Sequence, residues 1–277
     1  MTLQTTSPDT WLSPAVATKI INASAKLWFA TVLIGQVIFS AYIVAFYYSA
    51  AAANELELFS TVMPAGYIEG DFWGNVAVVG HVIFAAAITV GGLLQLIPHI
   101  RSKVPALHRW NGRLYISIAL IMSLSGAFML VTRYDKVAGD MFGHIALMLN
   151  GVIIVTCAFF AFKYARQKQF AIHRHWALRL FLAVSGVWLF RVGLMAWLSL
   201  HQAPVGFDPT TFSGPFLNVL YVLVYLMPLV FLEFYLRAQA RGSVNQKVAT
   251  AIGVVVISCV IILGTIGATL GMWFPQS

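Results

Sequence analysis

The chain has 277 residues, of which 60% are hydrophobic and only 9% are charged. Ordinary soluble domains carry about 25% charged residues, so this chain could not cover a water-exposed surface. The composition excludes a soluble enzyme, a disordered chain and a secreted disulfide scaffold, and the net charge of +8 is not gathered on a module that could bind nucleic acid. It predicts an integral membrane protein, whose first partner is the lipid bilayer.

Seven apolar stretches are long enough to span a bilayer, which requires about 20 residues of helix. The first 25 residues form a short tail ahead of them, without a cleavable signal peptide. The sequence therefore predicts an all-α fold and a single membrane domain over residues 1–277. The spans are expected at residues 26–48, 72–97, 110–132, 141–164, 176–198, 213–236 and 248–272.

Lysine and arginine predict the orientation of these spans, because both accumulate in short cytoplasmic loops. Most of the 17 basic residues lie before the first span or around the second-to-third, fourth-to-fifth and sixth-to-seventh loops. Only Arg133 and Lys136 lie on the opposite side, and Arg191 falls inside the fifth span. We expect a cytoplasmic N-terminus, an outer C-terminus and a location in the bacterial inner membrane.

The histidines of spans two to five fall in two layers. His81 and His144 lie toward the outer ends of the second and fourth spans, whereas His108 and His173 open the third and fifth spans on the cytoplasmic side. A haem iron accepts an imidazole nitrogen on each axial face. The layout predicts two b-type haems, or one at the outer pair alone, in a four-helix core over residues 72–198, with the first, sixth and seventh spans peripheral.

Basic side chains are the expected partners of haem propionates. Arg191 is the strongest candidate, because an arginine at that depth is costly unless it faces the bundle interior and finds a partner. It could instead meet a quinone carbonyl, or form a buried ion pair with Asp140 or Glu69. Four further candidates surround the inner histidines: Arg109, Arg113, Arg174 and Arg179.

Two strings in the chain resemble the bacterial membrane family catalogued as domain of unknown function 2306. They are Leu107-His108-Arg109-Trp110-Asn111-Gly112-Arg113-Leu114-Tyr115 and His173-Arg174-His175-Trp176-Ala177-Leu178-Arg179. The likeness covers roughly residues 72–198 and implies a fold context without an activity. The family's His-x-x-Trp-x-x-Arg motif aligns with His173, which favours this residue as the ligand and leaves His175 as the alternative. Ala177 departs from the pattern, which often has Met there.

The alternating histidines are also similar in layout to cytochrome b561-type proteins, which are transmembrane electron carriers with two b haems. This similarity implies His81 with His144, and His108 with His173, as axial pairs. The lysine-rich ascorbate site of the animal and plant members is absent. The resemblance therefore implies a bacterial quinone or quinol, or a periplasmic redox protein, as partner, and one implied activity is a quinone-linked oxidoreductase. Association as a homo-oligomer or within a respiratory complex stays open.

Two other interpretations compete with haem binding. The first is a non-enzymatic membrane subunit, or a transporter of a small solute or protons, in which the histidines and arginine form a polar network. Such a protein would have helix breaks near the bilayer midplane, for which Pro228 and the Gly91-Gly92 pair are candidates. The second is a metal site at His81 and His144, for which Asp140 is the only obvious third ligand.

Overall fold

The computed structural model describes residues 12–63, 65–134, 136 and 139–274. These residues form helices and turns, and within them only an isolated β-bridge, between Asp208 and Ser213, breaks the helical pattern. Six helices are long and apolar enough to cross a membrane, and a bent pair makes a seventh span when it is counted as one. The predicted all-α membrane fold is confirmed, and the fifth predicted span is the one in two pieces.

The helices are numbered in chain order. Five of them have proline in the first turn, where the backbone N–H has no partner within the helix. Short π-helical segments at Val44–Tyr48 and Thr269–Trp273 continue the first and last helices, and a 3-10 helix covers Leu56–Thr61. The α-helices are α1 (Pro14–Ile43), α2 (Ser49–Ala52), α3 (Phe72–Leu96), α4 (Pro98–Lys103), α5 (Pro105–Thr132), α6 (Met141–Arg166), α7 (Phe170–Val184), α8 (Gly186–His201), α9 (Pro215–Tyr225), α10 (Met227–Arg241) and α11 (Val244–Ala268).

Helix α1 begins at Pro14, so the expected tail of 25 residues is wrong. The Ser13 hydroxyl accepts a hydrogen bond from the backbone N–H of Val16 at 3.3 Å and caps the helix, and Pro14 opens it. Hydropathy predicted a later start for this helix, because its first turns are less apolar than the rest of it. The helix therefore starts before the apolar stretch that the sequence analysis identified.

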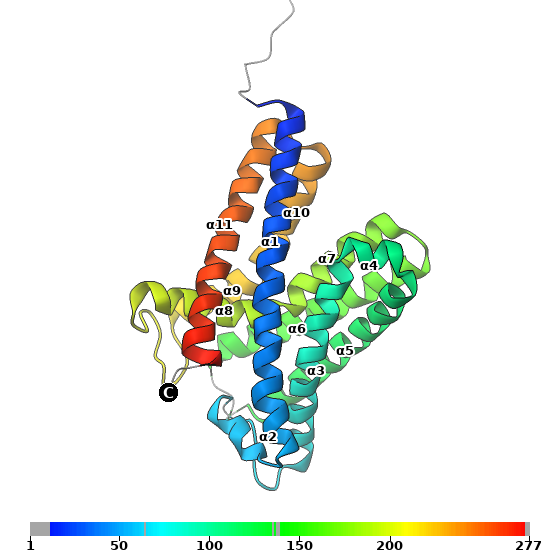
Figure 1. The fold of residues 1–277 in the computed structure, drawn as a ribbon. Helices are drawn as coiled ribbons and strands as arrows, with labels where there is room; N and C mark the ends of the chain where they lie inside the picture. Colours follow the sequence, from blue (N-terminus) through cyan, green and yellow to red (C-terminus); the bar gives the residue numbers. More distant parts are fainter. Residues whose placement is uncertain (1–11, 64, 135, 137–138, 275–277) are drawn as a thin grey trace, which may run out of the picture.

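Neighbouring helices pack against one another. Helices α1 and α11 run alongside each other, and α3, α5, α6 and α7 group on one side of α1 (Figure 1). Helix α8 packs on α11, and α9 contacts both α6 and α8. Gly264 allows the close approach of α11 to α8, because a Cβ atom there would overlap the carbonyl oxygen of Val192. Small residues at such contacts are the usual basis of helix association in lipid.

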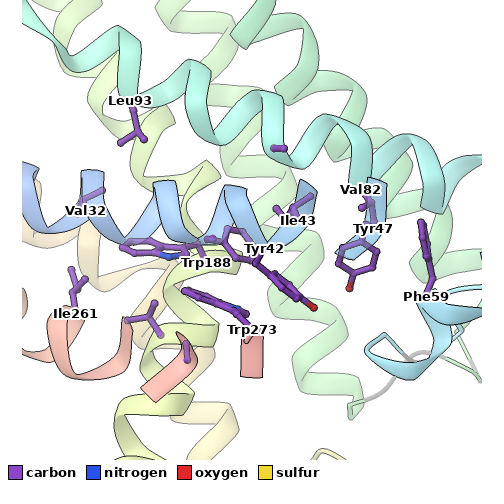
Figure 2. Close-up of a cluster of buried hydrophobic side chains, with 14 of the residues drawn as sticks. Val32, Tyr42, Ile43, Tyr47, Phe59, Val82, Leu93, Trp188, Ile261 and Trp273 are labelled. Atoms are coloured by element: carbon purple, nitrogen blue, oxygen red, sulfur yellow. The ribbon is translucent and has the colours of Figure 1, made fainter. Parts of the chain in front are cut away.

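A buried aromatic cluster lies where the end of α1 meets α3, α8 and the C-terminal π-helical turn (Figure 2). The rings of Phe39 and Tyr42 pack on Trp273, with centroid distances of 5.2 and 6.3 Å. Trp188 of α8 and Val82 of α3 belong to the same cluster. These contacts fix α1 against the helices that carry the predicted site, although the sequence analysis placed the first span at the periphery.

Candidate functional site

A cavity of about 600 Å³ lies inside the bundle, between α1, α3, α5, α6 and the junction of α7 with α8. Its size falls in the range of about 300–1,000 Å³ that is typical of cofactor and small-molecule sites. Most of its lining is aliphatic or aromatic. The ionisable side chains on its wall include His81, Arg133 and Arg191. An apolar cavity with a few polar groups is the usual form of a ligand site, so these residues define the candidate site.

His81 lies on the cavity wall with its ring orientation fixed by a serine of the neighbouring helix. Its Nδ1 is 2.9 Å from the Ser125 hydroxyl, and that hydroxyl is 3.2 Å from the carbonyl oxygen of Met122. The donor in the His81–Ser125 bond depends on the tautomer of the ring. In the tautomer with its proton on Nδ1, the serine oxygen accepts that proton and the lone pair of His81 is on Nε2. Metal-ligating histidines have this arrangement, in which the second ring nitrogen donates to a fixed acceptor.

Arg191 reaches the same cavity from α8 and lies within range of the imidazole of His81. Its guanidinium group lies 5.8 Å from the ring centroid of Phe39 and makes a long 3.4 Å hydrogen bond to the carbonyl oxygen of Val187. It forms no salt bridge with a carboxylate in the described part of the chain. The ion pair with Asp140 or Glu69 that we considered is thus not formed, and Asp140 instead caps α6 through the N–H of Gly143.

Arg133 is a cavity residue that the sequence analysis treated as part of an outer loop. Only 3% of it is exposed, and its guanidinium pairs with Asp71 at 2.8 Å and donates to Asn75 at 2.7 Å. Asp71 also accepts the N–H of Gly74, and this bond, followed by that from Arg133, holds the pKa of the Asp71 carboxyl below its ordinary value. The sequence contains a signal for this ion pair, because Asp71 and Asn75 stand one turn apart at the start of one span and Arg133 stands at the end of the next.

His144 is buried at the start of α6 but does not belong to the lining of the cavity. Its ring lies edge-on to Tyr134, with a centroid distance of 4.9 Å. Neither ring nitrogen makes a hydrogen bond within the described residues. His144 is therefore not a wall residue of this cavity, and its joint ligation of a haem with His81 stays a prediction. No group of three metal-ligating side chains occurs in the described residues, so the three-ligand metal site with Asp140 is not formed.

The inner histidines stand in the first turns of α5 and α7. His173 donates from Nδ1 to the carbonyl oxygen of Ala161 at 2.8 Å, which leaves the lone pair on Nε2 as in His81. His108 lies within charge range of His173, and its buried Nδ1 has no hydrogen-bond partner among the described residues. His175 is exposed. Between the two alternatives on α7, His173 therefore has the geometry of a ligand.

The other arginines that were predicted to bind haem propionates have different surroundings in the structure. Arg179 pairs with Glu233 of α10, with nitrogen–oxygen distances of 2.7 and 2.9 Å, and lies over the ring of Trp176. Arg109 and Arg113 are exposed, and the guanidinium of Arg113 lies 4.8 Å from the ring centroid of Trp110. Arg109 and Arg113 face outward, and Arg179 is already paired.

A family model described as "Predicted membrane protein (DUF2306)" matches residues 78–230, which is more than half of the chain. The chain belongs to this family. The match includes His81, Arg133 and Arg191 and excludes α1 and α11. No curated protein and no solved structure matches the chain. Membership in this DUF2306 family and the apolar helices establish a multi-pass membrane protein.

The fifth span of this family member is broken at the cavity wall. Helices α7 and α8 meet at Ser185 with a bend of 51°. Gln36 of α1 donates from Nε2 to the Ser185 hydroxyl at 2.9 Å, and that hydroxyl bonds the carbonyl oxygen of Phe181. Serine–glycine pairs are frequent places for such bends, and Gly186 follows Ser185. The span predicted over residues 176–198 is therefore bent at Ser185, and Gly91 and Gly92 lie inside an unbroken α3. Near Pro228, α9 ends and α10 begins, with Leu226 between the two helices.

Proposed function

We propose that this protein is a membrane cytochrome that binds b-type haem inside the bundle and carries electrons across the membrane. One observation carries the proposal: His81 stands on the wall of a 600 Å³ apolar cavity, with its Nδ1 bonded to Ser125, and Arg191 lines the same cavity. This gives an imidazole lone pair and a cation that lacks a carboxylate partner among the described residues. Haem needs both an axial nitrogen and a partner for its propionates.

The residues present fit haem at one axial position, and they offer candidates for the remaining axial positions. Haem, when bound, supplies an iron that gains or loses one electron. His81 would hold it from α3, and the proposal keeps His144 as the second outer ligand because its ring nitrogens are buried without partners. His108 and His173 would form the inner pair, which is supported by the Nδ1 bond of His173. Two haems would then lie at different depths of the bundle.

The chain's own residues would set the properties of the site. Ser125 keeps the proton on Nδ1 of His81, so that Nε2 is always available as a ligand. The aliphatic and aromatic lining excludes water, which strengthens the field of Arg191 inside the cavity. Arg191 would hold a propionate or the carbonyl of a quinone. A quinone or quinol of the bacterial inner membrane, or a periplasmic redox protein, is the proposed electron partner.

The test is the visible spectrum of the full-length protein, purified from cells supplied with haem. We expect a Soret band and an α band in the reduced-minus-oxidised spectrum. H81A and H173A should each remove about half of the bound haem, because each removes one ligand of one haem. H175A is the matched control, since His175 is an exposed histidine on the same turn as His173. Haem-free wild-type protein would refute the proposal, and loss of all haem in H81A would reduce it to one site.

A transporter of a small solute or protons is a second candidate, which the break at Ser185 favours. Discontinuous helices line the substrate sites of many transporters, because their unpaired backbone groups can bind a solute. The bent pair α7–α8 meets the cavity beside Arg191. This alternative predicts a haem-free protein that acidifies or loads vesicles when it is reconstituted. The S185A variant, which removes the bond from Gln36, should then change the transport rate.

A further inference from the structure

An exposed cluster of cations joins α4 to the first turns of α5. Arg101 and Lys103 stand in the last turn of α4, and Arg109 and Arg113 follow on α5. None of the four forms a salt bridge with a carboxylate of the described residues. The cluster lies between α3 and α5, which both span the membrane. We expected Arg109 and Arg113 to meet haem propionates, but both side chains are exposed.

Apolar side chains are interleaved with these cations and are exposed as well. Val104 is 46% exposed, Leu107 is 45% exposed, and the indole of Trp110 is 68% exposed. A site for a soluble polyanion would leave these side chains in water, which is unfavourable. At the edge of a bilayer the aliphatic groups reach the acyl chains and the indole lies at the level of the headgroups. The mixture therefore fits a lipid better than a nucleic acid or a phosphopeptide.

We propose that Arg101, Lys103, Arg109, Arg113 and Trp110 form a site for the phosphate headgroup of an anionic phospholipid. Arg109 and Arg113 are four residues apart and emerge on one face of α5. The guanidinium of Arg113 is positioned over Trp110 at 4.8 Å from the ring centroid, which leaves its outer N–H groups available to phosphate oxygens. Basic clusters at the cytoplasmic ends of membrane helices bind such headgroups.

This inference is independent of haem. It assigns three arginines and one lysine of the family-matched region to the surface of the protein, where they select lipids from the surrounding bilayer. Each cation near an anionic lipid surface contributes about 1 kcal/mol, which corresponds to roughly a fivefold change in affinity. Removing two cations should therefore weaken anionic lipid binding by a factor on the order of 20.

The test compares phosphatidylglycerol with phosphatidylcholine, titrated into the detergent-solubilised full chain and counted by native mass spectrometry. The wild type should retain phosphatidylglycerol, and the double variant R109Q/R113Q should lose this preference. The matched control is R237Q/R241Q, which removes two exposed arginines at the same spacing from the end of α10. Glycerol 3-phosphate, a free phosphate ester, should not compete with the lipid.

Three outcomes would overturn the proposal. Equal losses in the two double variants would mean that total charge, and not this cluster, selects the lipid. Competition by glycerol 3-phosphate at a concentration similar to that of the lipid would indicate a site for a free phosphate. A fall in the haem content of R109Q/R113Q, without a change in lipid preference, would return both arginines to the haem site. The side chains are exposed, so we expect both double variants to fold.

Discussion

Ser125 illustrates how a single hydroxyl determines the chemistry available at the cavity. It is hydrogen-bonded to Nδ1 of His81 and donates a hydrogen bond to the carbonyl oxygen of Met122, an arrangement that favours the tautomer with the proton on Nδ1. The imidazole is thereby held in one tautomer and in one orientation. A serine in an apolar helix is unremarkable in the sequence, and its role appears only when α3 and α5 are placed side by side.

The variant S125A should lower the haem affinity of the outer site by about tenfold, because loss of the partner of a ligating histidine typically costs 10- to 100-fold. The variant S123A is the control. Ser123 lines the cavity, and its hydroxyl is bonded to the carbonyl oxygen of Ala119 in its own helix. Haem retention during gel filtration would measure both variants. Equal losses would show that the His81–Ser125 bond has no special role.

Asp71 gives a residue-scale prediction about pH. Its carboxyl has a lowered pKa in the folded protein, because it accepts the Gly74 N–H and pairs with Arg133. A depressed pKa stabilises the fold above the ordinary value of 3.8, and this contribution is lost as the pH falls through the lower, folded value. The unfolding temperature should therefore fall below about pH 4 in the wild type, and less steeply in D71N. Parallel pH profiles for the two proteins would contradict the ion-pair account.

At the scale of elements, the packing of α11 on α8 depends on the absence of a side chain at Gly264. A Cβ atom there would overlap the backbone of Val192, so G264A should lower the free energy of unfolding by about 1–3 kcal/mol. G80A is the matched control, since no atom lies within 4 Å of the corresponding Cβ position in α3. Alanine is the better helix former, so G80A should be neutral or stabilising by up to about 1 kcal/mol. Thermal unfolding in one detergent would compare them.

The elements that local sequence could predict are those set by length and hydropathy. Seven spans were found in this way, since an apolar run of 20 residues has few alternatives to a membrane helix. The bend at Ser185 and the burial of Arg133 could not be derived from hydropathy. Both depend on partners distant in the chain, Gln36 for the bend and Asp71 for the arginine. The histidines could be assigned to layers, but their contacts with Ser125 and Ala161 required the packed helices.

At the scale of the whole molecule, the orientation in the membrane is the main prediction that stays open to test. Of the two basic residues expected outside, Arg133 is buried in an ion pair, which leaves Lys136 as the exposed one. In a background without native cysteines, P209C in the α8–α9 loop should react with an impermeant thiol reagent on intact cells. Q167C in the α6–α7 turn should react only after permeabilisation. The reverse pattern would place the N-terminus outside.

The contact between α1 and α11 has a consequence for how the chain is made. Helix α1 is synthesised before α11, along which it packs, so this partner surface is absent until α11 has been made. Until then the face of α1 that packs on α11 must rest against lipid or against an insertion factor. Assembly around α3 to α7 can proceed early, because these helices contact their neighbours in sequence. Packing of α11 on α1 then follows the assembly of α3 to α7, and a chain truncated before Val244 should be inserted with the partner face of α1 uncovered.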